Sequence, residues 1–380
     1  MLKKKDWSRS LVFIRHLHAV GQGAFFTEQF LVNGKSDLNV IYDCGALSKK
    51  ILDTEIERTF AYDKTKSLHV DVLFISHLDD DHFNGIPFLI EKGCVDDKTV
   101  VILPFSYPLL LFYLLDDIKL NNQTKNALKK LFQSKAKILG VNYIEGIGQI
   151  SNNEEVSLEE IYGKYDNYST INNTTLFKYK QIWYYVPFMN VNVIKVWDKF
   201  KGNLTSYKID LEKLKDAEYV EKNLGTLKKV YNSVKIKGIK GVTPINVCSL
   251  QMISFKSKNI LCKYVFAPNV NLSKTNCVLS CLFSGDTIIN NVFIKTLDSI
   301  RAFLGFPIEM LQIPHHGRES CFNKEIFDED RFESAFVNYY SSHKKNDYVK
   351  TVEDFMKKNR KNFYHITENC NYVLMVTLFP

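Results

Sequence analysis

The feature that most constrains the fold is the segment Ser76–Gly85, which is rich in histidine and aspartate and directly follows an apolar stretch. Two histidines and three aspartates fall within the six residues from His77 to His82. Residues 70–75, which precede the run, are apolar apart from one aspartate, and this is typical of a buried strand. Carboxylates at one strand end repel one another unless a cation lies between them. An acidic turn with Asp81 as the N-cap of the next helix explains one aspartate but neither histidine, so we expect a metal site.

Two further strand-like segments also end in possible metal ligands. Residues 278–283 lead to Gly285-Asp286, and residues 309–313 lead to His315-His316-Gly317. A Gly-Asp pair alone is a common turn, but four of the nine histidines lie in the first and third motifs. Imidazole and carboxylate ligands together suit zinc, manganese or iron. The three motifs therefore predict donor groups at three strand ends.

The order of strand-like and helix-like patterns indicates an α/β fold. Strand patterns cluster near both ends of the chain with helices between them, which suggests two sheets packed face to face with helices outside. The expected strands are 11–17, 24–32, 39–42, 70–75, 99–103, 278–283, 309–313, 334–340 and 371–377, and the expected helices in these regions are 83–91, 291–303 and 351–358.

The middle of the chain has a different composition. Residues 106–247 are rich in Lys, Asn and Tyr, contain no histidine, and suggest a helix pair (109–115 and 123–135) and a long helix at 210–233. We interpret this segment as a large, mainly helical insertion or cap. The chain then divides into two halves of one sandwich, 1–105 and 248–380, with 106–247 inserted between them.

Composition narrows the class of protein. With 380 residues, 45% hydrophobic and 24% charged, the chain is typical of a soluble globular protein. A net charge of +8 permits an anionic partner without requiring one. The eight cysteines include no CxxC pair, which favours reduced thiols and a cytoplasmic location. The longest apolar run, 104–115, is shorter than the ~20 residues of a membrane span, so we expect no membrane partner.

In this order the motifs resemble those of the metallo-β-lactamase fold. They are most similar to the branch that contains the ComEC-type competence-protein hydrolase domain and phosphorylcholine esterase, which has HxDxDH in place of the commoner HxHxDH. The resemblance covers residues 10–104 and 245–378 and implies a metallo-β-lactamase-like αββα sandwich. The matching elements are His77-x-Asp79-x-Asp81-His82, Val20-Gly21-Gln22-Gly23, Asp43-x-Gly45, Gly285-Asp286 and His315-His316-Gly317.

The resemblance also implies a ligand set for two divalent metal ions. It assigns the first ion to His77, Asp79 and one of the adjacent histidines, taken as His316. It assigns the second ion to Asp81 and His82, with Asp286 bridging both ions.

The sequence departs from the family at one ligand. The family supplies a further second-metal histidine from a Tyr-Gly-His-Pro element, and an ungapped match puts Asp347 at that position. His343, four residues earlier, is the alternative ligand. Aspartate is a competent ligand for hard cations, so the carboxylate-rich set favours manganese beside zinc.

The expected function is that of a two-metal hydrolase whose substrate is a phosphodiester. The resemblance favours DNA, another nucleic acid or a nucleotide as substrate. The residues expected to act in catalysis are Asp81, Asp286 and His315, and His315 either protonates the leaving group or binds the phosphate. The alternatives are a hydrolase of another small ester or phosphoester, and a degenerate metal-binding sensor or scaffold.

For some side chains outside the motifs, both a structural and a functional role are considered. His16 and His18 share a strand face, where a structural role is favoured over lining the site. Lys125, Lys129 and Lys130 recur on one expected helix, where a solvated face is favoured over contact with a phosphate backbone.

Overall fold

The computed structural model describes most of the chain. The described residues are 11–60, 68–104, 122–142, 154–167, 169–189, 199, 202–210, 213, 217–233, 249–266, 279–305, 307–342 and 347–379.

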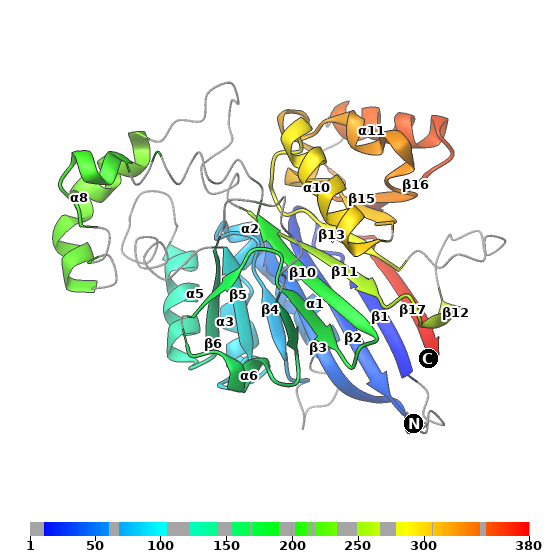
Figure 1. Ribbon diagram of the computed structural model, residues 1–380, viewed down its shortest axis with the longest axis horizontal. Coiled ribbons are helices and arrows are strands. Elements are labelled where there is room, and N and C mark those ends of the chain that lie inside the picture. The colour runs from blue at the N-terminus through cyan, green and yellow to red at the C-terminus, as the bar shows by residue number, and fades with distance from the viewer. Residues whose placement is uncertain are drawn as a thin grey trace.

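The described strands form two large sheets (Figure 1). In spatial order, the first sheet contains β12 (Leu261–Phe266), β17 (Tyr372–Phe379), β1 (Leu11–Leu17), β2 (Gly23–Val32), β3 (Lys35–Ala46), β4 (Val72–Phe74), β5 (Val100–Pro104), β6 (Lys137–Asn142) and β8 (Thr170–Asn172). The second contains β16 (Asn362–Ile366), β15 (Ser334–Asn338), β14 (Met310–Gln312), β13 (Cys281–Phe283), β11 (Leu250–Lys256), β10 (Trp183–Met189), β9 (Leu176–Tyr179) and β7 (Glu155–Ser157).

Helices cover the outer face of each sheet. Buried side chains of α10 (Asn291–Leu304) and α11 (Asp347–Lys358) pack on the second sheet, and both helices lie at the upper right of Figure 1. On the first sheet the covering helices are α1 (Lys49–Phe60), α2 (Asp80–Phe83), α3 (Ile86–Glu91) and α5 (Asn122–Gln133). Helix α8 (Ala217–Ser233) lies at the far left of Figure 1, apart from the sheets. The remaining elements are α6 (Ile161–Lys164) and the 3₁₀ turns η3 (His315–Gly317), η4 (Glu319–Cys321) and η5 (Lys324–Asp330). The expected α/β sandwich of two sheets with outer helices is confirmed.

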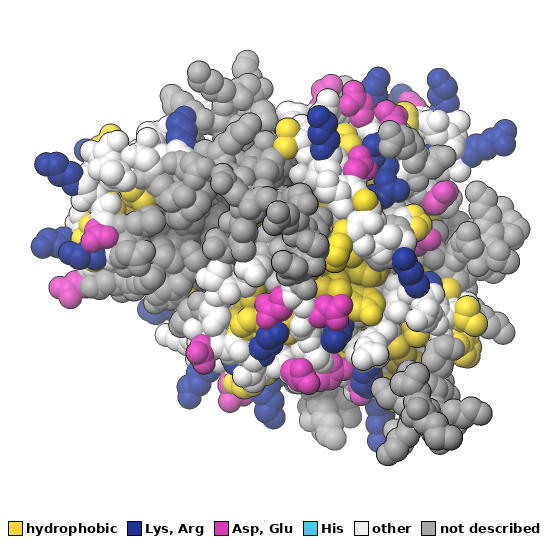
Figure 2. All heavy atoms as spheres, in the orientation of Figure 1, with side chains coloured by type: hydrophobic (Ala, Val, Ile, Leu, Met, Phe, Trp, Pro, Cys, Tyr) yellow, Lys and Arg dark blue, Asp and Glu magenta, His cyan; other side chains and the backbone are white. Residues whose placement is uncertain are grey.

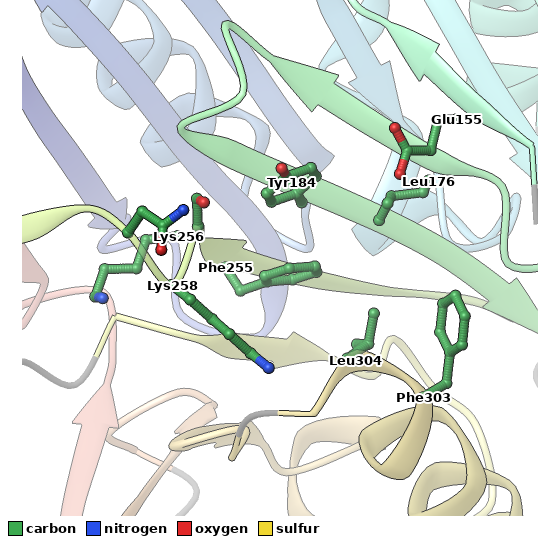
Figure 3. Close-up of a pocket in the computed structure, with 10 residues that line it drawn as sticks. Glu155, Leu176, Tyr184, Phe255, Lys256, Lys258, Phe303 and Leu304 are labelled. Atoms are coloured by element: carbon green, nitrogen blue, oxygen red, sulfur yellow. The ribbon is translucent and has the colours of Figure 1, made fainter. Parts of the chain in front are cut away.

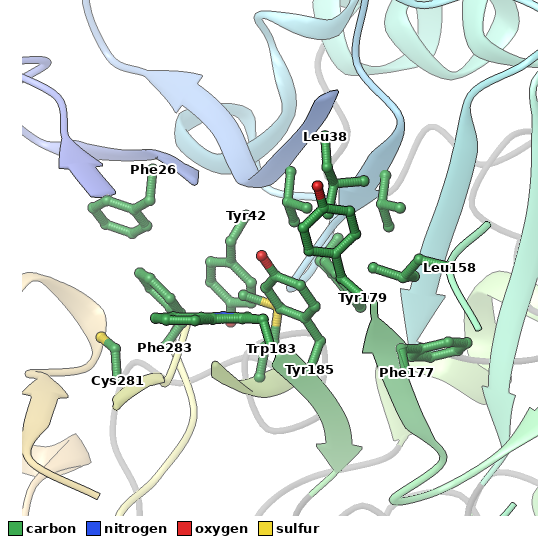
Figure 4. Packing of buried hydrophobic residues seen from close by; sticks show 14 of the residues in the cluster. Phe26, Leu38, Tyr42, Leu158, Phe177, Tyr179, Trp183, Tyr185, Cys281 and Phe283 are labelled. Carbon is green, nitrogen blue, oxygen red and sulfur yellow. The ribbon is translucent and has the colours of Figure 1, made fainter. Parts of the chain in front are cut away.

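Alternation of side chains along the strands explains the layers. On β2, Phe26 joins the cluster between the sheets, while its neighbour Phe25 packs under the helices of the first sheet. Between the sheets, the rings of Tyr42 and Phe283 lie 5.1 Å apart, and Figure 4 shows Trp183 beside them. Because Tyr42 precedes Asp43 and Phe283 ends β13, this aromatic packing fixes the strand ends from which the site is built.

The predicted elements in the two flanks are largely present. The expected strand 11–17 is β1, and the expected helix 291–303 is α10 with one residue more. The helix expected at 83–91 is instead two short helices, α2 and α3, separated at Asn84 and Gly85. The backbone turns there because Gly85 packs against Cys44, where a Cβ would lie 2.6 Å from the thiol sulfur.

The middle segment differs from the expected helical insertion. Its described part contributes β6 and β8 to the first sheet and β7, β9 and β10 to the second, as well as α5, α6 and α8. The helix expected at 123–135 is present as α5, and the helix expected at 210–233 begins later, at Ala217, as α8. Residues 109–115 lie outside the described residues. Strands of both sheets therefore come from the range 106–247. Strand β7 buries only one of its three residues, Val156, so it carries little apolar signal in the sequence.

The surface carries both charges. On the face in Figure 2, lysine and arginine side chains alternate with acidic ones around the rim and do not gather into one patch. Lys129 is exposed and Lys130 pairs with Glu91, while the Lys125 side chain lies outside the described set. Among the described residues, no helix combines the length and apolar character needed to cross a membrane.

Candidate metal centre

The first motif lies where β4 ends and α2 begins. Residues 75–79 connect the two elements, and α2 starts at Asp80 with Asp79 as its N-cap. The Asp79 side chain makes no capping hydrogen bond. Its Oδ2 lies 3.5 Å from His77 Nε2 instead. Helix capping therefore does not account for the aspartates of this motif.

A close backbone approach positions this motif against β3. A Cβ built on Gly45 would lie 2.4 Å from Asp81 C and His82 N. Only glycine therefore lets the end of β3 approach α2 this closely.

Asp286 lies between the histidines of the first motif and His315. It follows β13 through Gly285, whose φ is +56°. Its Oδ1 is 3.2 Å from His82 Nε2, and its Oδ2 is 3.7 Å from His77 Nε2. Burial opposes ionisation of Asp286, but the surrounding imidazoles, His82 first, hold the pKa of this carboxyl well below its usual range.

His82 is held by an outer carboxylate. Asp43, at φ 57° on β3, accepts from His82 Nδ1 at 2.8 Å and from the Ser76 backbone N–H at 2.6 Å. Because a carboxylate only accepts, Nδ1 of His82 carries a proton and Nε2 faces Asp286. Burial opposes a second proton, yet Asp286 and Asp43 raise the pKa of His82 well above its usual value. The surroundings therefore favour positive charge at this imidazole.

His77 is held through a hydroxyl. The Ser76 hydroxyl donates to Asp43 at 2.6 Å, so at 2.9 Å it accepts the proton of His77 Nδ1. The Nε2 atom of His77 is then left facing Asp79 and Asp286.

His316 is oriented in the same way from the second sheet. Its Nδ1 donates to the Asn338 carbonyl at 3.1 Å, and its Nε2 lies 3.1 Å from Asp81 Oδ2. All three histidines thus use Nδ1 for an outer partner and turn Nε2 towards carboxylates. This is the arrangement by which proteins orient histidine ligands of metals.

The donor atoms fit a divalent metal ion. Two groups have ligand atoms within 4.8 Å of one another: His77, His82 and Asp286, and Asp81, His82 and His316. His82 Nε2 is buried and makes no well-formed hydrogen bond within the described residues. Imidazole nitrogen with carboxylate oxygen is a set that zinc and manganese accept. Residues of this chain can therefore hold a metal here.

The structure brings together most of the sequence-predicted residues but groups one of them differently. His316 was expected with His77 and Asp79, whereas its Nε2 lies with Asp81 and His82. The cause is the Asn338 carbonyl at the end of β15, which fixes the imidazole from the other side. Asp79 lies beside His77 with 37% of its side chain exposed.

The remaining predicted ligand stays a prediction. His343 and the side chain of Asp347 lie outside the described residues, although Asp347 is the first residue of α11.

His315 lies beside Asp286 with a cation next to it. Its Nδ1 is 3.5 Å from Asp286 Oδ2, and its Nε2 is 3.4 Å from Arg318 Nη1. Because a guanidinium only donates, Nε2 accepts and the ring is neutral in this arrangement. Burial first, with Arg318 contributing, lowers the pKa of His315.

Sequence reasoning missed the roles of several partners. Asp43 was noted only as part of a family motif, and Ser76, Asn338 and Arg318 were given no role. The adjacency of Ser76 to His77 and of Arg318 to the His-His-Gly motif was the available signal. Nothing in the sequence marks the Asn338 carbonyl, since any residue supplies one.

A separate pocket lies away from this centre. It has a volume of about 350 Å³ and lies between β9–β11 and the end of α10, where Tyr184, Phe255 and Phe303 face it together with Lys258 (Figure 3). None of its lining residues belongs to the donor groups.

The chain was compared with protein-family models, curated proteins and solved structures. No family model and no curated protein matches the chain. Among solved structures, one match is the metallo-beta-lactamase fold protein YhfI from Bacillus subtilis, with 9% sequence identity and a TM-score of 0.40. The match covers 95% of this chain and 99% of that chain.

Proposed function

We propose that the protein is a two-metal hydrolase that acts on phosphodiesters. The observation that carries the proposal is the position of Asp286. One of its oxygens is 3.2 Å from His82, and the other is 3.5–3.7 Å from His315 and His77. A carboxylate with donor groups at both oxygens is suited to bridge two cations.

The proposed ligands divide around that carboxylate. His77 and Asp79 hold the first ion, and Asp81, His82 and His316 hold the second, with Asp286 shared. Bound divalent ions would lower the pKa of a water molecule and stabilise charge on a phosphoryl group. The carboxylate content of the set favours manganese beside zinc. All these ligands come from the ranges 1–105 and 248–380.

The chain's own residues orient the ligands and favour an anionic substrate. Outer bonds from Asp43, Ser76 and Asn338 keep the Nε2 atoms turned inward, which reduces the reorganisation needed on binding. Arg318, next to His315, supplies positive charge beside the centre. We assign this pair to binding a non-bridging phosphate oxygen, because a guanidinium matches phosphate geometry. A nucleic acid or nucleotide is the favoured source of that phosphate.

Adjacent aspartates provide a matched test. Asp81→Asn removes a proposed ligand, whereas Asp80→Asn changes the same charge one residue earlier in α2. We expect Asp81→Asn to lower bound metal and to reduce hydrolysis of bis-p-nitrophenyl phosphate by roughly 100-fold or more, with Asp80→Asn close to wild type. Metal analysis and initial rates measure both effects.

The outcomes separate the rival functions. Equal rates in the two variants would remove Asp81 from the site. Metal retained without hydrolysis of chromogenic, single-stranded, double-stranded or cyclic nucleotide substrates would favour a sensor or scaffold. Cleavage of carboxylic esters but no phosphodiester would favour the small-ester alternative.

A further inference from the structure

A second histidine–carboxylate cluster lies outside the candidate metal centre. It consists of His16 on β1, His18 just beyond that strand, and Glu55 on α1; we call it the β1–α1 cluster. One ligand atom from each residue lies within 4.8 Å of the other two. The cluster shares no residue with the donor groups around Asp286.

The geometry brings two regular elements together. His18 is buried, and its Nδ1 lies 3.4 Å from Glu55 Oε2. The rings of His16 and His18 are 3.8 Å apart, and His18 stacks on Phe25 at 4.0 Å. The Glu55 side chain is 12% exposed, so a carboxylate is held largely out of water beside two imidazoles.

Each histidine has an outer partner on Nε2. For His18 this is the Thr27 hydroxyl at 2.9 Å, and for His16 it is the Asn371 side-chain N–H, which donates to Nε2 at 2.9 Å. A hydroxyl can donate or accept, so Thr27 can receive a proton from His18 Nε2, whereas the Asn371 amide must first turn its oxygen towards His16. The proton of each neutral imidazole then moves to Nε2 and leaves a lone pair on Nδ1. An outer hydrogen bond of this kind orients histidine ligands in metal sites.

We propose that His16, His18 and Glu55 form a binding site for a divalent transition metal of the zinc class. Two imidazoles and one carboxylate are a known zinc ligand set, in which water takes the fourth position. Because the ligands come from β1 and α1, a bound ion ties the strand to the helix that covers the first sheet.

One neighbouring cation competes for the carboxylate. Arg58 Nη2 lies 2.7 Å from Glu55 Oε2, and 52% of the Arg58 side chain is exposed. Its removal eliminates both the competing hydrogen bond and the repulsion of an incoming cation. The proposal therefore predicts that Arg58→Gln binds the ion more tightly, whereas a purely structural Glu55–Arg58 pair predicts no gain.

The test compares two glutamates of α1. Glu55→Gln removes a ligand, while Glu57→Gln removes the same charge from an exposed residue that pairs with Lys92. Each chelator-stripped protein is reloaded with Zn²⁺, dialysed and analysed for metal. We expect wild type and Glu57→Gln to hold one equivalent more than Glu55→Gln. Titration with Co²⁺, followed by its visible absorption, should give Arg58→Gln a severalfold lower Kd for this equivalent.

The readouts do not depend on hydrolytic activity. A bound ion stabilises the native state, so Zn²⁺ should raise the Tm of wild type more than that of Glu55→Gln. His16→Asn, at a half-buried position, gives the same expectation if Glu55→Gln does not fold. Equal metal content in wild type, Glu55→Gln and His16→Asn would overturn the proposal, as would an unchanged Kd in Arg58→Gln.

Discussion

The two histidine clusters are built on different kinds of backbone. Around the candidate metal centre, Asp43, Gly285, His315 and His316 all have φ between 50° and 57°. His16 lies within a regular strand and Glu55 within a regular helix. Left-handed backbone is costly for residues other than glycine and persists only where the surrounding structure enforces it. In this protein, residues with left-handed backbone gather at the candidate metal centre, where donor groups from both sheets meet.

The outer partners differ as well. At the candidate metal centre they include the Asp43 carboxylate and the Asn338 carbonyl, which can only accept and therefore fix the tautomer. At the β1–α1 cluster they are a hydroxyl, which permits either tautomer of His18, and an amide N–H, which must be replaced by the amide oxygen before His16 Nδ1 can bind metal. The comparison teaches that the first cluster is pre-organised for metal and the second must adjust to it. We therefore expect tighter binding at the first.

The largest expected effect comes from the backbone that supports the first cluster. Gly45→Ala would force the Cβ against the backbone of Asp81 and His82, so we expect loss of bound metal and of hydrolysis. The free energy of unfolding should fall by about 1–3 kcal/mol, which chemical denaturation measures. Gly225, in α8, has no atom within 4 Å of the built Cβ, so Gly225→Ala should stabilise by roughly 0.5–1 kcal/mol. Similar losses in both variants would contradict this account.

An intermediate effect is expected at the outer carboxylate. Asp43→Asn leaves one acceptor oxygen for bonds from Ser76 and His82, so metal affinity should fall by about 10–100-fold in a competition titration. Asp71 accepts the Asn39 backbone N–H at 2.7 Å on the same sheet and is the control. Asp71→Asn should leave metal affinity unchanged. Parallel losses in the two variants would mean that Asp43 acts on the fold alone.

The smallest effect is expected at Thr27, and this prediction depends on the proposed metal site in the β1–α1 cluster. Thr27→Val preserves shape but removes the hydroxyl at His18 Nε2. Because a neutral hydroxyl orients less firmly than a carboxylate, the Co²⁺ affinity of this cluster should fall by at most about 10-fold. Thr54, exposed on α1, serves as the control through Thr54→Val. A loss of Co²⁺ affinity as large as the loss of metal affinity in Asp43→Asn would mean that the two clusters are equally pre-organised.

The sequence allowed the flanks to be predicted because their strands carry strong local signals. Residues 11–14 and 281–283 are apolar, and both lie in strands of the core, β1 and β13. The middle strands lacked such a signal. Pro187 lies within β10, and proline in a run argues against a paired strand. The helix α1 was overlooked although Leu52, Ile56 and Phe60 repeat every four residues on its buried face.

For the site, sequence identified residue types but not neighbours. The motifs named the donors His77, His82 and Asp286, which the structure brings together. The grouping of His316 with Asp81 could not be predicted, because it depends on how η3 is held against β15. Strand order alone does not determine which way a side chain turns at a strand end.

The pairing of β1 with β17 constrains how the nascent chain can reach this state. Leu11 lies opposite Leu378, so the partner of β1 is synthesised 367 residues (378 − 11) after it. At translation rates of about 5–20 residues per second, one edge of β1 waits on the order of tens of seconds for β17. During that interval β1 presents unpaired amide and carbonyl groups to other chains. Solubility during production therefore depends on how soon β17 is synthesised and on whether chaperones shield that edge until then.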